Sequence, residues 1–172
     1  APYRAGFACF VGRPNAGKST LMNAIIGQKI AITSSKPQTT RHRVLGIKSG
    51  DDYQIIFLDT PGIIDPRYRL QEAMMRSVRH AISDADLLLL MADATQDSPD
   101  EMSLEHIGDR PAILVVNKID KIRQEDALPL VEAYIQLRAF EEVIPTSALH
   151  GHNLDVLLEQ IVARLPEGPP FY

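Results

Sequence analysis

Short, mostly apolar runs alternate along the chain with longer segments in which apolar residues recur at helical spacing. Continuous runs of this kind are typical of strands that are covered on both faces. Six strands are expected, at residues 7–11, 44–48, 53–58, 86–93, 111–116 and 143–144. Their alternation with helices predicts an α/β domain whose six-stranded sheet is mostly parallel and has helices on both faces.

One pair of strands departs from the parallel pattern. Residues 44–48 and 53–58 are joined only by the turn-forming segment 49–52, and so short a connection makes them antiparallel neighbours. Helices are expected directly after residue 17, from about residue 71, and over residues 99–108, 126–138 and 154–165. The buried side of the second helix is expected to consist of Ala73, Met74, Val78 and Ala81.

The residues between the first strand and the first helix carry the strongest chemical signal. Residues 12–19 read GRPNAGKS, which fits the phosphate-binding pattern G-x-x-x-x-G-K-[ST]. Its glycines let backbone N–H groups point at phosphates, Lys18 reaches the β- and γ-phosphates, and Ser19 offers a hydroxyl to Mg²⁺. The loop therefore predicts a nucleoside triphosphate as ligand. The residues expected to bind it are Gly12, Arg13, Pro14, Asn15, Ala16, Gly17, Lys18, Ser19 and Thr20.

Two later segments indicate which base is bound. Residues 117–120 read NKID, and the carboxylate of Asp120 can accept hydrogen bonds from the ring N–H and the exocyclic amine of guanine. Adenine presents a lone pair at the same place, so guanine is favoured. After the last strand, the backbone N–H of Ala148 is expected to meet the guanine carbonyl. The residues assigned to the base are Asn117, Lys118, Ile119, Asp120, Ser147, Ala148 and Leu149.

Composition mainly excludes other classes of function. The 172 residues suit one domain, and a net charge of −4 gives no basic footprint, so no strong nucleic-acid patch is expected in it. The single cysteine, Cys9, falls in the first apolar strand and is expected to be buried and unreactive. No apolar run is long enough to span a bilayer. A cytoplasmic monomer is expected, with peripheral association at the inner membrane as the alternative location.

These motifs, in this order, resemble those of the translation-factor-related GTPases over nearly the whole chain. The segments GQKI at 27–30, KPQTTRHR at 36–43 and LPEGPP at 165–170 narrow the resemblance to the Era family. It implies a Ras-like P-loop GTPase domain over residues 1–165. It also implies that residues 166–172 begin a linker to a KH domain outside this chain, through which 16S ribosomal RNA and the 30S subunit are bound.

The resemblance further assigns roles around the γ-phosphate. Asp59 would hold Mg²⁺ through water, and Thr40, with Thr39 as the alternative, would complete a metal shell that includes Ser19. The segment that carries Asp59 adds to the nucleotide-binding set the residues Asp59, Thr60, Pro61, Gly62 and Ile63. The residues expected to take part in hydrolysis are Lys18, Asn15, Thr40 and Gly62.

Two residues bear on how fast GTP is cleaved. Ile63 stands where Ras-like enzymes have the glutamine that orients the attacking water, and an alkyl chain cannot do this. Slow intrinsic hydrolysis is therefore expected. Asn15 has two interpretations: it ligates a K⁺ ion that supplies charge in place of an arginine finger, as in related GTPases, or it only shapes the loop.

The leading hypothesis is a GTP-hydrolysing switch that acts in assembly of the small ribosomal subunit. A GTP-gated RNA- or ribosome-binding module with incidental turnover stays open, since Ile63 is compatible with it. A tRNA-modification or tandem-domain ribosome-assembly GTPase shares the motifs but would lack the segment at 36–43 and the closing tail. An ATP-using kinase is excluded if ATP fails to compete with GTP.

Overall fold

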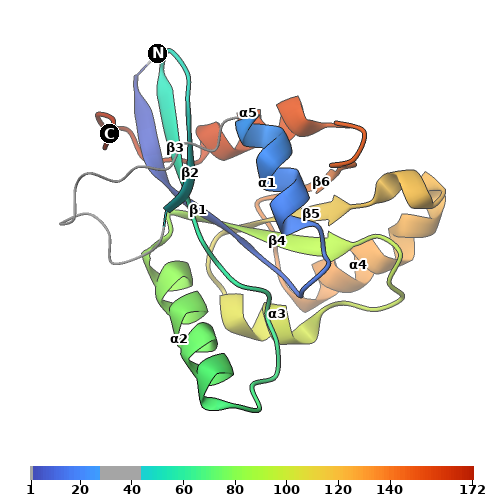
Figure 1. The fold of residues 1–172 in the computed structure, drawn as a ribbon. Coiled ribbons are helices and arrows are strands. Elements are labelled where there is room, and N and C mark those ends of the chain that lie inside the picture. Colours follow the sequence, from blue (N-terminus) through green and yellow to red (C-terminus); the bar gives the residue numbers. More distant parts are fainter. Residues whose placement is uncertain (1, 28–43) are drawn as a thin grey trace.

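A computed structural model describes residues 2–27 and 44–172, which form a six-stranded sheet between two layers of helices (Figure 1). The strand order is β2-β3-β1-β4-β5-β6; β2 runs antiparallel to β3, and the other four pairs are parallel. The strands are β1 (Arg4–Val11), β2 (Val44–Ser49), β3 (Tyr53–Leu58), β4 (Leu87–Asp93), β5 (Ala112–Asn117) and β6 (Glu142–Pro145). The predicted fold class, including its single antiparallel strand, is confirmed.

The helices pack on both faces of this sheet. They are α1 (Lys18–Ile26), α2 (Arg69–Asp84), α3 (Glu101–Ile107), α4 (Leu128–Leu137) and α5 (Leu154–Ala163), with two 3-10 turns, η2 (Ile119–Lys121) and η3 (Gln124–Ala127). In β1, Ala8 and Phe10 pack toward α1 and α5, whereas Cys9 and Val11 pack toward α2, α3 and α4. Both faces of the sheet are thus apolar. Of the described helices, none is long and apolar enough to cross a membrane.

The buried side of α2 differs from the predicted one. Met75, Val78, Ala81 and Ile82 are buried, Met74 is half-buried, and Ala73 is exposed. The prediction for Ala73 was wrong because it lies about 140° around the helix from Val78, the residue at the centre of the buried side. The opposite side of α2 consequently faces away from the core along its whole length.

Cys9 lies in the middle of β1 and is fully buried, as predicted. Burial raises the pKa of its thiol to about 12, with the charge of Arg110 acting weakly in the other direction. The thiol therefore stays protonated at neutral pH, which makes Cys9 a small apolar core residue.

The segment after α5 runs back along the start of the sheet. The buried amide of Gln54 in β3 accepts hydrogen bonds from the backbone N–H groups of Phe171 and Tyr172, at 2.8 and 3.1 Å. Its Nε2 donates to the carbonyl of Tyr172 at 3.3 Å, and the ring of Phe171 lies 4.9 Å from that of Phe7. Residues 166–172 thus lie against the domain, and their predicted role as the beginning of a linker stays a prediction.

Candidate nucleotide-binding site

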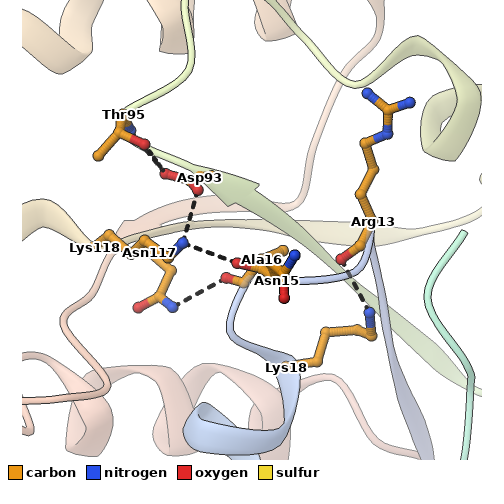
Figure 2. Close-up of polar contacts among 8 residues, drawn as sticks. All are labelled: Arg13, Asn15, Ala16, Lys18, Asp93, Thr95, Asn117 and Lys118. Carbon is orange, nitrogen blue, oxygen red and sulfur yellow. Dashed lines mark hydrogen bonds and ion pairs between the residues drawn. The ribbon is translucent and has the colours of Figure 1, made fainter.

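The candidate site lies at one edge of the sheet, where parallel strands end side by side. The loop at residues 12–17 follows β1, Asp93 ends β4, and Asn117 ends β5, so their polar groups converge (Figure 2). In an open α/β sheet this edge, beyond the carboxyl ends of the strands, is where ligands bind.

The loop after β1 contains a glycine with left-handed backbone and binds the ammonium group of Lys18 through its carbonyls. Gly17 has φ +99°, and a Cβ atom there would lie 2.3 Å from Nδ2 of Asn117, so both the conformation and the space require glycine. The ammonium group of Lys18 donates to the carbonyls of Gly12 and Arg13 at 3.1 and 3.2 Å. The loop therefore presents a positive charge at the start of α1, as an anion-binding loop does.

Negative groups act on Lys18 from two sides. Burial lowers the pKa of the Lys18 ammonium, and the charges of Asp100 and Asp59 act in the opposite direction.

Two of the three predicted Mg²⁺ ligands lie among the described residues. Asp59 follows β3, and Ser19 is exposed in the first turn of α1. A carboxylate and a hydroxyl are oxygen ligands of the kind that Mg²⁺ prefers, so these two residues fit the predicted metal shell. Thr40, the third predicted ligand, lies outside the described residues.

Asn117 joins three segments through one buried side chain. Its Nδ2 donates to the carbonyl of Ala16 at 3.2 Å, which fixes the phosphate-binding loop to β5. Its Oδ1 accepts from the hydroxyl of Thr146 at 3.2 Å and from the backbone N–H of Ala148 at 3.1 Å. The N–H of Ala148, assigned to the guanine carbonyl from the sequence, can therefore reach a base only as a shared donor. Thr146 was missed by sequence reasoning.

Lys118 links the base-reading segment to the phosphate-binding loop. Its backbone is left-handed (φ +67°), and its ammonium lies between the carbonyl of Asn15 and Oδ2 of Asp93, 2.8 Å from each (Figure 2). Asp93 was also missed, although a carboxylate at the end of the apolar run 87–91 could have drawn attention to it. Its Oδ1 accepts from the backbone N–H of Thr95 at 2.9 Å.

The acid strength of Asp93 reflects these contacts. Partial burial raises the pKa of this carboxyl, but hydrogen bonds from Lys118 and Thr95 outweigh burial, and the net pKa is lowered. Because the folded-state pKa is the lower one, the contribution of Asp93 to folding is fully present above about pH 4. It is lost as the pH falls through the lowered pKa, so the contact with Lys118 is intact at neutral pH.

Replacing Asp93 by alanine is expected to accelerate GDP dissociation about 10-fold, because Lys118 loses one of its two acceptors and its position along the base. Stopped-flow release of a fluorescent GDP derivative measures this rate. Thr95→Ala is the matched control, since it removes a hydrogen bond to Asp93 and keeps the contact with Lys118. Equal rates for Asp93→Ala and the unsubstituted chain would contradict the positioning role.

Asp120 is held as an ionised acceptor. Its Oδ1 accepts from the hydroxyl of Ser147 at 2.8 Å, and Nε2 of His150 lies 3.6 Å from its Oδ2. The hydrogen bond from Ser147 lowers the pKa of Asp120, burial opposes it, and the charges of His150 and Lys121 lower it further. A fixed, charged carboxylate is the group that reading the two N–H functions of guanine requires.

The segment after Asp59 rests directly on the phosphate-binding loop. The N–H of Ile63 donates to the carbonyl of Gly12 at 2.7 Å, and a Cβ atom on Gly62 would lie 2.7 Å from the nitrogen of Pro14. A shift of residues 62–63 would consequently disturb these contacts with the phosphate-binding loop.

Several residues assigned to the ligand turn their side chains elsewhere. The hydroxyl of Thr60 donates to the carbonyl of Phe10 in β1, and the side chain of Ile63 is buried in the core beside α2. Ile119 is half-buried against the same core, whereas the side chain of Leu149 is 69% exposed. If Thr60, Ile63 or Ile119 contacts the ligand, the contact comes from its backbone.

A phosphate-binding loop, an adjoining base-reading N-K-x-D segment and a Ras-like sheet together define a P-loop GTPase domain. The family described as "50S ribosome-binding GTPase" matches residues 7–118, and the chain belongs to this family of GTPases. The GTPase Era of Alkaliphilus metalliredigens is 45% identical to the chain over 174 residues, which cover 99% of this chain and 59% of that protein. The chain thus spans about three fifths of the length of this relative.

Solved structures agree with this assignment. Era of Aquifex aeolicus, a variant bound to GDP and AlF₄⁻, superposes with a TM-score of 0.84 at 41% identity, covering 98% of this chain and 60% of that one. An Era in complex with MgGDPNP and a segment of 16S ribosomal RNA gives a TM-score of 0.84 at 41% identity, covering 99% and 60%. The resemblance to the Era family predicted from the sequence is confirmed.

Proposed function

We propose that this chain binds GTP, hydrolyses it to GDP and phosphate, and acts as the switch of an Era-type protein in assembly of the small ribosomal subunit. The observation that carries the proposal is the joined pair of loops at the site. Lys118 and Asn117 bond the base-reading segment to the carbonyls of Asn15 and Ala16, so a guanine ring and a triphosphate are received by one connected structure.

The proposed division of labour follows the geometry of the site. Residues 12–20 hold the phosphates, Asp120 reads the base, and Ser19, Asp59 and Thr40 hold Mg²⁺. The metal would neutralise charge between the β- and γ-phosphates, while Lys18 stabilises charge on the transferring group. The side chain of Ile63 is buried in the core, which supports slow intrinsic hydrolysis.

The wider role is proposed from the relatives. Era proteins extend beyond the matched part, and one of them is bound to MgGDPNP and 16S ribosomal RNA. We propose that residues 166–172 lead into an RNA-binding KH domain that contacts 16S RNA within the 30S subunit. Monomeric state and location in the cytoplasm or at the inner membrane stay predictions.

The proposal is tested by measuring binding and turnover with both purine nucleotides. We expect tight binding of GDP and GTP, no competition from a thousandfold excess of ATP, and slow release of phosphate from GTP in single-turnover experiments with Mg²⁺. Displacement of GTP by ATP would overturn the guanine assignment. Tight GTP binding without turnover in the presence of 30S subunits would favour the GTP-gated binding module.

For Asn15 we propose the cation-binding role. Asn15 has a left-handed backbone (φ +72°), is exposed at the phosphate-binding loop, and has its carbonyl fixed by Lys118 at 2.8 Å. Because Lys118 bonds the backbone carbonyl of Asn15, the side-chain oxygen of Asn15 is not needed for this contact. We propose that this oxygen binds a monovalent cation beside the phosphates.

Single-turnover hydrolysis is expected to be about 10-fold faster in KCl than in NaCl at equal ionic strength, because a bound K⁺ adds positive charge at the transition state. Asn15→Ala should abolish the difference, whereas Asn15→Asp keeps an oxygen ligand and should retain part of it. Equal, slow rates in both salts would instead mean that a partner supplies the missing charge.

A further inference from the structure

The exposed side of α2 carries three arginines and a histidine against the carboxylate of Glu72. Arg69, Arg76 and His80 follow one another at intervals of seven and four, so they lie on one line along the helix, opposite the buried Val78. Arg79 flanks this line and is also exposed. In Figure 1, α2 stands at the margin of the molecule and packs against the rest by one side. The basic side is therefore open to a large partner.

These arginines have no ion-pair partner among residues 2–27 and 44–172. The side chains of Arg67, Arg69, Arg76 and Arg79 make no ion pair or hydrogen bond with any residue that the structure describes. Residues 65–84 hold four arginines against three carboxylates and so carry a net charge of +1, whereas the remainder of the chain carries −5. The overall charge of −4, from which no strong nucleic-acid patch was expected, thus does not exclude a local group of arginines on α2.

An aromatic side chain lies at the start of the same helix. Tyr68 immediately precedes α2 in extended backbone (φ −130°, ψ 160°), and 67% of it is exposed. Its neighbours Arg67 and Arg69 are both exposed. Exposed aromatic rings among arginines are the combination on which nucleic-acid bases stack while phosphates are neutralised.

We propose that the α2 basic face, consisting of Arg67, Tyr68, Arg69, Arg76 and Arg79, binds single-stranded RNA. The guanidinium groups contact successive phosphates, and Tyr68 stacks on a base. Arg69 and Arg79 are ten residues apart, about 15 Å along the helix axis, which spans several phosphates of an extended strand. The inference rests on the proposed role at ribosomal RNA, and it adds a contact made by the GTPase domain itself.

RNA is favoured over an acidic protein because the face joins planar guanidinium groups to an exposed ring. Arginine pairs with phosphate and with carboxylate through two parallel hydrogen bonds, so the choice rests on Tyr68, whose exposed ring has a stacking partner in an unpaired base. Leu70, two residues after Tyr68, is 73% exposed and adds apolar surface at the start of α2.

The test is fluorescence anisotropy of a labelled 20-nucleotide single-stranded RNA, titrated with the 172-residue chain in GDP and Mg²⁺ at several KCl concentrations. The double variant Arg76→Gln, Arg79→Gln is compared with Lys121→Gln, Arg123→Gln, which removes the same charge from exposed positions outside α2. Glutamine keeps helix propensity, so the α2 variant is expected to fold.

Neutralising two phosphate contacts should reduce the slope of log affinity against log salt by about 1.4, at about 0.7 for each charge on a single strand. The control variant should leave this slope nearly unchanged. Tyr68→Ala should weaken RNA binding at least about 5-fold without changing the salt slope, because stacking does not depend on counterion release.

Three outcomes would overturn the proposal. They are an unchanged slope for the α2 variant, an equal loss for the control variant, or poly-glutamate binding as tightly as RNA with the same dependence on α2, which would indicate an acidic protein partner. GDP affinity is measured for every variant in parallel. If the unsubstituted chain does not bind GDP, the proposed GTPase function is refuted. If it binds GDP but not RNA, only the proposed RNA contact of α2 is refuted.

Discussion

Asp120→Asn is expected to weaken the binding of GDP and GTP about 10³- to 10⁴-fold. In the proposed complex, the carboxylate oxygens of Asp120 accept from two N–H functions of guanine. An asparagine amide turns one of these acceptors into a donor that faces the exocyclic amine. Isothermal titration with GDP measures the loss.

The same substitution should improve the binding of xanthosine diphosphate, because xanthine carries a carbonyl where guanine has its amine. The asparagine amide can donate to that carbonyl while its oxygen accepts from the ring N–H. Ser147→Ala serves as the control: it removes the 2.8 Å hydrogen bond to Asp120 but leaves the carboxylate, so a loss of only about 10-fold is expected. Undiminished GDP binding by Asp120→Asn would refute the assignment of base recognition to this residue.

Lys18→Ala is expected to slow single-turnover GTP hydrolysis about 10²- to 10³-fold, because it removes a positive charge aimed at the transferring phosphoryl group. Rapid-quench measurement at saturating enzyme isolates this step from product release. The ammonium also bonds the carbonyls of Gly12 and Arg13, so the thermal midpoint of the variant is measured beside its rate.

The conservative change Lys18→Arg separates charge from shape. Arginine keeps the positive charge, but its planar guanidinium does not fit a position built for a compact ammonium, so an intermediate rate is expected. A Lys18→Ala variant that is folded and cleaves GTP at the unsubstituted rate would contradict the catalytic role of this lysine.

The contacts among the loops explain how nucleotide state could reach the rest of the molecule. Ile63 bonds the phosphate-binding loop through its backbone, and the chain then runs through Tyr68 directly into α2. We expect a change at the γ-phosphate that moves residues 59–63 to reach the start of α2 through the five residues 64–68. The α2 basic face is consequently placed where the proposed RNA contact and the bound nucleotide can influence each other.

The local motifs were readable from the sequence because each needs only neighbouring residues. Gly17 and Lys18 at fixed spacing predict a phosphate-binding turn before a helix, and Asp120 after a buried strand predicts the base. The apolar run within residues 86–93 predicts a strand covered on both faces, and it forms β4. Binary patterning and turn chemistry depend on short stretches of chain, and here they agree with the fold.

What only the tertiary structure decided are contacts between segments far apart in the chain. Asp93 has no motif, and its role appears only when β4 and β5 are neighbours and bring it within 2.8 Å of Lys118. The two sides of α2 likewise depend on the packing around Val78. The sequence by itself determined a guanine-nucleotide site and the α/β order of its elements, because local spacing sets both. The partners of each polar side chain, and the exposure of the arginines on α2, were decided by packing, which joins residues that no local pattern connects.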